Sequence, residues 1–547
     1  MQTTFPRLML KHAAERPSAP ALREKEYGIW QTTPWADLAK LVEAIACGLH
    51  QAGLQRGEHM VIVGSNRPRL SATMLAAQSL GAIPVNLYQD AAAPECVFPI
   101  NNAEVRFCVV EDQEQVDKML EVREQCPQLA HIVYDDPRGL RLDELIAAGQ
   151  VFMAQHPQFF HLEVEKGTSA DVAAMFFTSG TTGNPKGVVH THSTLIDRAQ
   201  AGAEFDKLTS AEDVLAYMPP AWIGQNIFSY AQWLVCGYVV NCPESAATVT
   251  IDLKEIGPTY YFAPPRVFEG MLTSVMIRME DAGNFKRKMF HTFMDVAKKV
   301  GPALMDGQSV GLLDRIKYTL GNWMVYGPLR NNLGFSRVRV AYTAGEAIGP
   351  DLFTFYRSIG VNIKQLYGST ETAVFVCLQP DNEARADTVG VPCKGVEIKV
   401  ADNGEILVKS PGLLKGYYKN PEATAEVLTA DGWYHTSDAG FIDNVENKLK
   451  FFPFIKEVVA YGDQREKACV MINIDFDAVG NWAERRNLPY AGYTDLAQKA
   501  EVYELIKDCV EKVNADLAED ALLAGSQVSR FLVLHKELDA DDGELTR

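Results

Sequence analysis

Apolar and polar positions alternate between two periods along the first four hundred residues. Between Trp35 and Ala52, apolar side chains recur every three or four residues, which predicts an amphipathic helix. The short apolar run His59–Gly64 follows and predicts a buried strand. The pattern continues with a helix over 69–80 and strands over 82–87, 105–110 and 131–134. Alternating helices and strands predict α/β layers with largely parallel sheets.

The pattern changes after about Ser410. Glycine and proline punctuate short strands over 412–440, which predicts a β-rich subdomain with many turns. Later residues return to a compact α/β pattern with strands over 457–461 and 468–474 and an amphipathic helix over 502–517. We therefore expect an α/β protein with two domains. Residues 1–443 would form a large domain of layered α/β subdomains plus the β-rich subdomain, and residues 444–547 a small, mobile α/β domain.

Composition and charge narrow the class of partner. The chain has 547 residues, of which 47% are hydrophobic and 22% charged, as in ordinary globular proteins. Its 52 basic and 70 acidic residues give a net charge of −18. Such a chain does not attract nucleic acid or an anionic membrane overall, although a local basic patch stays open. We expect no nucleic-acid partner.

The cysteines and one uncharged segment indicate where in the cell the protein is expected and whether it has a membrane segment. Ten cysteines are scattered without a Cys-x-x-Cys pair, so we interpret them as reduced, mostly buried thiols of a cytoplasmic protein rather than metal ligands. Residues 1–17 carry charges and lack the features of a signal peptide. Residues 214–243 are uncharged but contain proline, glycine and amide residues. We interpret them as a buried core helix, or one lining an apolar pocket, and expect no integral membrane segment.

The stretch Met175–Val189 carries the clearest chemical signal. An apolar run leads into four hydroxyl residues interleaved with glycines, and Lys186 follows. Glycines let backbone N–H groups approach a polyphosphate, hydroxyls add donors, and lysine adds a compact positive charge. The spacing is not that of a Walker A loop, because Gly187 stands where Ser or Thr would bind magnesium. The pattern favours a phosphate-binding loop over a flexible surface loop of small polar residues.

Residues 178–187 strongly resemble the phosphate loop of the adenylate-forming superfamily, which includes acyl-CoA synthetases, luciferase-like enzymes and peptide-synthetase adenylation domains. Three further stretches resemble motifs of that family, in the family's order: Ala341–Ala347, Gln365–Thr372 and Gly432–Asp438. The resemblance covers nearly the whole chain. It is closest to the AMP-forming acyl-CoA ligases of long-chain type.

The resemblance implies a chemistry and a set of binding residues. Members activate a carboxylic acid: its carboxylate attacks the α-phosphate of ATP, which gives an acyl-adenylate and pyrophosphate. ATP and CoA would be co-substrates, and Mg²⁺ the cofactor. The residues that would bind ATP or AMP are Thr178, Ser179, Gly180, Thr181, Thr182, Gly183, Lys186, Gly345, Glu346, Ala347, Leu366, Tyr367, Gly368, Ser369, Thr370 and Asp438.

The resemblance also assigns roles within this set. The catalytic residues would be Thr178, Lys186, Thr370 and Glu371. Glu371, together with Thr182, would hold Mg²⁺, because oxygen ligands suit that hard cation. Thr370 would donate to the α-phosphate. Tyr367 would stack on adenine, and Asp438 would accept hydrogen bonds from the ribose. Taken singly, Tyr367 could be a core aromatic residue, Glu371 a solvated helix residue, and Asp438 a helix cap or turn residue.

Other stretches bear on the substrate. The segments 260–269 and 413–421 resemble acyl-CoA ligases, but Trp222 stands where long-chain members usually have histidine. A flat indole could pack against an aromatic or alicyclic acid as readily as an alkyl chain, or could merely fill the core. Arg266 and Glu269 could form a surface ion pair at helical spacing. The residues expected around the acyl group are Trp222, Gln225, Asn226, Gly368 and Ala373.

Two features of the family are not found in this sequence. The hinge segment with its Asp-Arg pair and lysine does not follow Asp443, and the sequence ends at Arg547 before the position of the family's adenylation lysine. Either the native protein is longer, or these segments are deleted. We therefore name no hinge arginine and no adenylation lysine.

These observations predict an AMP-forming carboxylate–CoA ligase for a medium- or long-chain fatty acid or another bulky hydrophobic acid. The alternative within the class is an aryl- or arylacetate–CoA ligase with the same mechanism, for acids such as benzoate, phenylacetate or indoleacetate. A more distant alternative is a non-catalytic nucleotide binder. The expected partners are small molecules, and a homodimer stays open.

Overall fold

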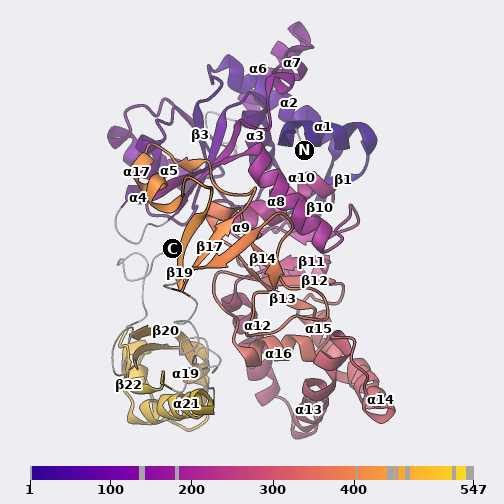
Figure 1. The fold of residues 1–547 in the computed structure, drawn as a ribbon, viewed down its shortest axis with the longest axis vertical. Helices are drawn as coiled ribbons and strands as arrows, with labels where there is room; N and C mark the ends of the chain where they lie inside the picture. The colour runs from indigo at the N-terminus through magenta and orange to yellow at the C-terminus, as the bar shows by residue number, and fades with distance from the viewer. Residues whose placement is uncertain are drawn as a thin grey trace.

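The computed structural model describes residues 3–134, 142–178, 184–401, 404–439, 449, 452, 454–461, 468–519 and 525–536. The largest sheet fills the upper part of the molecule in Figure 1. Its order is β18-β8-β7-β4-β3-β5-β6, with strands β3 to β7 parallel and β8 antiparallel to both β7 and β18. The strands are β3 (His59–Val63), β4 (Ile83–Leu87), β5 (Phe107–Val110), β6 (His131–Tyr134), β7 (Val172–Thr178), β8 (Lys186–Thr191) and β18 (Gly416–Tyr417).

Both faces of this sheet are buried. Met60 and Ile62 of β3 join one hydrophobic core, and Val61 and Val63 join a second one. The helices that contribute to these cores include α2 (Trp35–Gln51), α3 (Pro68–Ser79), α4 (Ala93–Asn102) and α5 (Gln113–Val122). Burial on both faces explains why the strand sequences are continuously apolar rather than alternating. The helices and strands predicted from the pattern are confirmed to within two residues.

A second α/β unit lies below the first in Figure 1. Its sheet has the order β11-β12-β13-β14-β15, in which β11, β12 and β13 are parallel. The strands are β11 (Tyr260–Phe262), β12 (Val340–Thr343), β13 (Ile363–Tyr367), β14 (Cys377–Leu378) and β15 (Val391–Pro392). The helices of this unit are α12 (Pro265–Glu280), α13 (Asn284–Met305), α14 (Leu312–Gly321), α15 (Gly327–Asn332) and α16 (Pro350–Ser358).

The two faces of β11 have different neighbours. Tyr261 packs in the core that this sheet shares with α12, α13 and α16. Tyr260 and Phe262 point to the other side and join the core of the first unit. The aromatic run Tyr260-Tyr261-Phe262 therefore joins the two α/β units through opposite faces of one strand.

The uncharged segment 214–243 is only partly helical. It runs through β9 (Asp213–Leu215), α9 (Ile223–Asn226), the π-helical turn η2 (Ile227–Ala231), α10 (Gln232–Cys236) and β10 (Val239–Cys242). The expectation of one core helix is therefore wrong in extent, although most of the segment is buried. Gly237, at φ +74°, ends the helix in the left-handed conformation that favours glycine. No helix in the described part of the chain is both long and apolar enough to cross a membrane.

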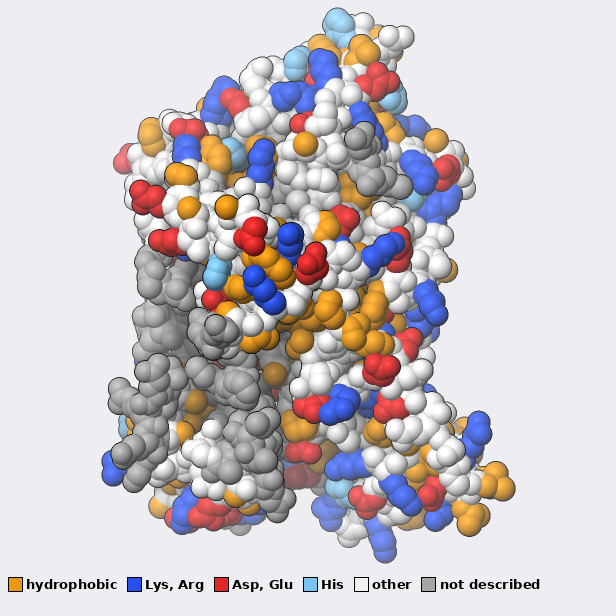
Figure 2. Space-filling model, in the orientation of Figure 1, with side chains coloured by type: hydrophobic (Ala, Val, Ile, Leu, Met, Phe, Trp, Pro, Cys, Tyr) orange, Lys and Arg blue, Asp and Glu red, His pale blue; other side chains and the backbone are white. Residues whose placement is uncertain are grey.

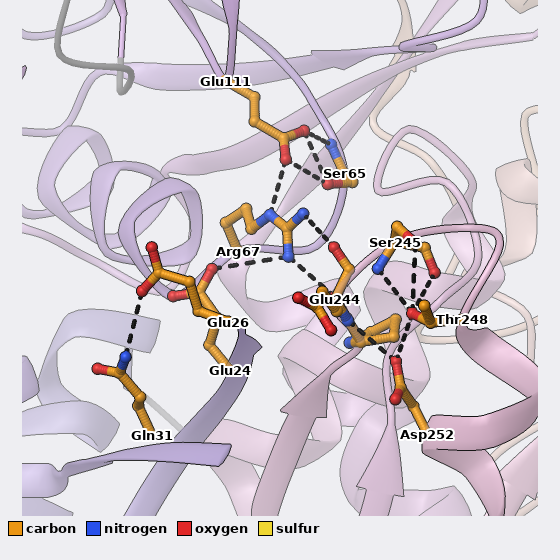
Figure 3. A network of polar contacts seen from close by, with 11 residues as sticks. Glu24, Glu26, Gln31, Ser65, Arg67, Glu111, Glu244, Ser245, Thr248 and Asp252 are labelled. Atoms are coloured by element: carbon orange, nitrogen blue, oxygen red, sulfur yellow. Dashed lines mark hydrogen bonds and ion pairs between the residues drawn. The ribbon is translucent and has the colours of Figure 1, made fainter. Parts of the chain in front are cut away.

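A network around Arg67 ties the first sheet to a four-stranded sheet of order β2-β1-β10-β9 (Figure 3). The other strands of that sheet are β1 (Pro20–Glu26) and β2 (Ile29–Pro34). The Arg67 guanidinium donates to Glu111 after β5 at 2.7 Å, and to the carbonyl oxygens of Pro243 and Glu244 after β10 at 2.9 Å each. Glu24 of β1 lies 3.6 Å away. This network, called the Arg67 network below, fixes the chain where β3 ends.

The remaining described residues form two small sheets. The β-rich part contains β16 (Glu397–Val400), β17 (Glu405–Lys409) and β19 (Tyr434–Ala439) in that order. The C-terminal part contains β20 (Ile455–Tyr461), β21 (Ala468–Ile474) and β22 (Val528–Val533), packed on α19 (Phe476–Glu484) and α21 (Ala500–Glu519) around a core of their own. The domain boundary expected near Asp443 lies outside the described residues and stays a prediction.

Exposed ion pairs connect the C-terminal part to α12. Arg485 contacts Glu280 and lies 3.0 Å from Asp281, and Arg266 lies 3.9 Å from Glu457. Arg266 thus faces the C-terminal part, and its pairing with Glu269 stays a prediction. Ion pairs this exposed contribute at most about 1 kcal/mol each. The ten cysteines are free thiols, and eight of them are buried, as expected.

Candidate active site

The predicted phosphate loop connects two paired strands. Thr178, at the end of β7, is the register partner of Lys186, at the start of β8. The loop therefore connects neighbouring ends of two paired strands of the main sheet, and Thr178 and Lys186 form its base. The other predicted loop residues lie outside the described residues, and their roles stay predictions: Ser179, Gly180, Thr181, Thr182 and Gly183.

Tyr417 lies between the base of this loop and a second motif. Its strand β18 pairs with β8, and the neighbouring backbone N–H of Tyr418 donates to the carbonyl of Gly187 at 2.8 Å. The Lys186 ammonium lies 5.0 Å from the centre of the Tyr417 ring, within cation–π range. The Tyr417 hydroxyl donates to Oε1 of Glu371 at 3.0 Å. Burial and the nearby Glu371 carboxylate raise the pKa of Tyr417, so this hydroxyl stays protonated.

Glu371 is held by its own backbone as well. It lies in a 3-10 turn, η4 (Thr370–Thr372), and its carbonyl accepts the N–H of Leu414 at 2.7 Å. The preceding carbonyl, that of Thr370, accepts from Nε2 of His190 at 2.7 Å. Burial lowers the pKa of His190 to about 4, so the ring is neutral and Nε2 carries the proton that it donates. Thr370 and Glu371 are thus positioned by two other segments.

The adenine-side residues meet because β12 and β13 are parallel neighbours. The segment Gly345–Ala347 follows the end of β12, and Tyr367 ends β13, so both lie at the same edge of the sheet. Gln365 holds them together: its Oε1 accepts the N–H of Ile348 at 3.1 Å, and its Nε2 donates to backbone carbonyls, among them that of Ala386 at 3.0 Å. The two motifs therefore lie side by side.

Tyr367 and Asp438 are joined directly. The Tyr367 hydroxyl donates to Oδ2 of Asp438, which projects from β19. Burial of the phenol and its hydrogen bond to Asp438 raise the pKa of Tyr367. The side chains assigned to adenine and to ribose therefore come from separate sheets and meet at one point.

Gly368 is required by the backbone around it. A Cβ atom at this position would lie 1.5 Å from the carbonyl oxygen of Val374. The turn that brings Val374 so close includes Ala373 at φ +51° and Val374 at φ +73°, conformations that are costly for side chains other than glycine. Whether Gly368 and Ala373 also border the acyl group stays a prediction.

Trp222 belongs to a stack of aromatic rings. Its indole lies 5.2 Å from the Phe262 ring at an interplanar angle of 17°, and Phe228 stacks on Phe262 at 4.1 Å and 7°. Gly224 leaves room for this stack, because a Cβ there would lie 2.6 Å from Phe262. Trp222 is half-buried at the end of the stack, whereas Phe228 and Phe262 are buried. Its indole is therefore the member of the stack that a ligand can reach.

Gln225 and Asn226 line a different space from the Trp222 stack. They border a small cavity of about 40 Å³ with Ser65, Asn66 and Asn86, among other residues. Gln225 accepts the N–H of Met218 at 3.2 Å and donates to Asn66 at 3.3 Å. The buried Oδ1 of Asn226 has no protein partner among the described residues, and a cavity of this size can hold water.

The carboxylate of Glu371 is the group predicted from the sequence to hold a magnesium ion, and that role stays a prediction. The described residues contain no group of three or more His, Cys, Asp or Glu side chains that could enclose a metal. Mg²⁺ is commonly bound by one or two carboxylates together with substrate phosphates. A partly exposed Glu371 beside the phosphate loop fits that mode of binding.

Three residues of the site were not assigned a role from the sequence. Tyr417 lies within the stretch 413–421 that resembles acyl-CoA ligases, but nothing in the pattern distinguished it from Tyr418. His190 lies near the end of β8 and Asn66 lies after β3, and a polar residue near a strand end is a weak signal. Their roles depend on contacts with residues more than 150 positions away.

Comparisons with known proteins place the chain in a family. The family described as AMP-binding enzyme matches residues 9–418. The chain is 27% identical to the long-chain-fatty-acid–CoA ligase FadD15 of Mycobacterium tuberculosis, over 98% of this chain and 92% of that one. It is 24% identical to the peroxisomal long chain acyl-CoA synthetase 7 of Arabidopsis thaliana, over 94% and 78%.

Solved structures share the fold. The anthranilate CoA ligase AuaEII in complex with anthranoyl-AMP superposes with a TM-score of 0.69 at 17% identity, covering 98% of this chain and 94% of that one. The long-chain-fatty-acid-CoA ligase FadD1 of Archaeoglobus fulgidus gives 0.62 at 17% identity, covering 98% and 97%. The family match spans well over half of the sequence and includes the first three motifs. This chain belongs to the AMP-binding enzyme family.

Proposed function

We propose that this protein is an AMP-forming carboxylate–CoA ligase. The observation that carries the proposal is the placement of Tyr417 between Lys186 of one motif and Glu371 of another. A cation at the base of the phosphate loop and a carboxylate suited to Mg²⁺ thus face one space. The relatives named as a long-chain-fatty-acid–CoA ligase and a long chain acyl-CoA synthetase support the same reaction.

In the first half-reaction, a carboxylate oxygen of the acid attacks the α-phosphorus of ATP. The bond to the bridging oxygen of pyrophosphate breaks, and pyrophosphate leaves. Lys186 supplies positive charge to the phosphates, and Thr370 donates to the α-phosphate, where negative charge develops. A magnesium ion bound by Glu371 and phosphate oxygens would supply further positive charge at this point.

Adenosine recognition falls to the edge where β12, β13 and β19 meet. Tyr367 presents its ring to the adenine, with Gly345–Ala347 beside it. Asp438 accepts hydrogen bonds from the ribose hydroxyls. Because the Tyr367 hydroxyl already donates to Asp438, that carboxylate is oriented before the nucleotide binds.

In the second half-reaction, the CoA thiolate attacks the acyl carbon and AMP leaves. The sulfur comes from CoA, so no cysteine of the protein is needed. We infer that the C-terminal domain, beginning near Asp443, moves between the two steps. The exposed ion pairs of Arg485 and Arg266 with their partners are weak enough for such a rearrangement. The free thiols fit a cytoplasmic location.

The acid is a medium- or long-chain fatty acid or another bulky hydrophobic acid. The second candidate is an aryl or arylacetic acid, and the stack of Trp222, Phe262 and Phe228 favours it, because a planar substrate can extend that stack. The structural likeness to an anthranilate CoA ligase supports the same alternative.

Exchange of labelled pyrophosphate into ATP tests the proposal. The purified full chain is incubated with ATP, Mg²⁺ and each acid of a panel, from butyrate to palmitate and then benzoate, phenylacetate and indoleacetate. Acid-dependent exchange identifies adenylate formation and the preferred class of acid. ATP binding by calorimetry without exchange for any acid would favour the non-catalytic nucleotide binder.

A further inference from the structure

Helix α14 carries large apolar side chains that face solvent. Leu312, Ile316 and Leu320 recur every four residues, with Leu313 beside them, and Trp323 follows in the π-helical turn η3 (Asn322–Tyr326). Their side chains are strongly exposed: 75% for Leu312, 56% for Ile316 and 79% for Trp323. These five residues are called the α14 apolar face below. Contiguous exposed apolar surfaces of this kind mark interaction sites.

The opposite side of α14 holds the helix to the protein. Tyr318 donates to the carbonyl of Ser358 at 2.9 Å, Asp314 pairs with Lys299 of α13 at 2.9 Å, and Gly321 packs against Tyr326. These contacts hold α14 to the protein by one side. The α14 apolar face, on the other side, is therefore part of an ordered helix.

Basic residues flank the α14 apolar face. At about 100° per residue, Arg315 and Lys317 fall on either side of the apolar stripe. Residues 284–323 contain seven basic and three acidic residues, a net charge of +4 in a chain whose net charge is −18. Figure 2 shows this end of the large domain, at the lower right, with hydrophobic, basic and some acidic side chains at its surface. An apolar helix face with a basic residue on either side, in a segment of net positive charge, suits the surface of an anionic bilayer.

We propose that α14 docks the protein on an anionic lipid surface, lying in the plane of the interface. The five apolar side chains enter the boundary between headgroups and acyl chains, and Trp323 lies at the depth that tryptophan favours. Arg315 and Lys317 contact lipid phosphates.

Flotation with vesicles tests this proposal without ATP, acid or CoA, so its result is independent of the proposed activity. We expect the full chain to float with phosphatidylcholine–phosphatidylglycerol vesicles and at least 5-fold less with pure phosphatidylcholine. The double variant I316E/L320E should lose at least 80% of the binding. V151E/I251E is the matched control, since both residues are more than half exposed elsewhere, and it should bind like the parent.

Tryptophan fluorescence tests whether Trp323 enters the lipid. Trp323 is one of seven tryptophans, so the difference between the fluorescence spectra of the parent and W323F reports on Trp323. Anionic vesicles should shift this difference spectrum to shorter wavelength, and brominated lipids should quench it. Absence of flotation, flotation unaffected by I316E/L320E, or a dimer in light scattering that I316E/L320E abolishes would each overturn the proposal.

Discussion

The Tyr417 hydroxyl donates to Oε1 of Glu371 at 3.0 Å, although the two residues lie on segments that meet only in the folded chain. The same ring faces Lys186 on its other side. Tyr417 therefore couples the carboxylate proposed for Mg²⁺ to the base of the phosphate loop.

Replacement of Tyr417 by phenylalanine should slow adenylate formation. The change keeps the ring under Lys186 but removes the donor that orients Glu371. A hydrogen bond to a charged group contributes about 1.5–3 kcal/mol, so the rate of pyrophosphate exchange at limiting Mg²⁺ should fall roughly 10- to 100-fold. Y418F is the matched control, since that ring packs on His59, 4.7 Å away, and it should exchange at the parental rate. Equal rates for Y417F and Y418F would remove Tyr417 from the site.

Replacement of Asp438 by asparagine should weaken ATP binding. The neutral amide keeps the shape but accepts hydrogen bonds less strongly from ribose and from the Tyr367 hydroxyl. We expect the KM for ATP to rise about 10-fold, with a smaller change for the acid. D431N, an exposed position on the turn before β19, serves as the control. A KM for ATP unchanged in D438N would contradict the proposed ribose contact.

Replacement of Trp222 by alanine should change which acids are accepted. Removal of the exposed end of the aromatic stack lengthens the available space and removes a planar contact. Longer fatty acids should gain relative to benzoate and phenylacetate in kcat/KM, by about 5- to 20-fold. W30A, at a half-buried tryptophan on β2, controls for the loss of an indole. An unchanged ratio would show that Trp222 does not contact the acid.

Replacement of Gly368 by alanine should disrupt the turn around Val374. The added Cβ would lie 1.5 Å from a backbone carbonyl, so the turn must move. We expect a loss of roughly 2–4 kcal/mol in the free energy of unfolding and loss of exchange activity. At Gly270, in helix α12, an added Cβ would meet no atom within 4 Å, so G270A should be neutral or slightly stabilising. Chemical denaturation of G368A and G270A measures both free energies of unfolding, and equal values would contradict the predicted clash.

Acid should destabilise the fold through His190. Burial lowers its pKa from 6.5 to about 4 in the folded protein, so the unfolded chain binds this proton at higher pH. Between those values the unfolded state holds more protons, and the free energy of unfolding therefore falls as the pH decreases from about 6.5 to 4. The loss due to His190 is about 3 kcal/mol. H190Q should show a smaller decrease over this window than the exposed control H156Q. Equal slopes for the two variants would contradict the assignment.

The sequence predicted the elements because their signals are local. The apolar run of β3 and the helical spacing of α2 follow from burial on a sheet and on one helix face. The motifs could be placed at strand ends, where parallel strands β12 and β13 bring Gly345 and Tyr367 together. The position of Tyr417 could not be predicted, because it depends on β18 pairing with β8 across more than 200 residues.

The segment around Trp222 shows a second limit of prediction from the sequence. Its uncharged composition correctly indicated burial, but hydropathy does not distinguish one helix from short helical turns between two strands. Trp222 and Gln225 line different spaces because Trp222 stacks on Phe262, whereas Gln225 donates to Asn66, which follows β3. Those contacts are not visible in a pattern of apolar and polar positions.

The most direct test of the proposed ligase reaction is the product stoichiometry of the complete reaction. The full chain is incubated with ATP, Mg²⁺, CoA and the acid preferred in the exchange assay, and the products are quantified by mass spectrometry. We predict AMP, pyrophosphate and acyl-CoA in equal amounts, with all three dependent on the acid. Formation of ADP, or AMP release without a CoA thioester, would contradict the proposed reaction.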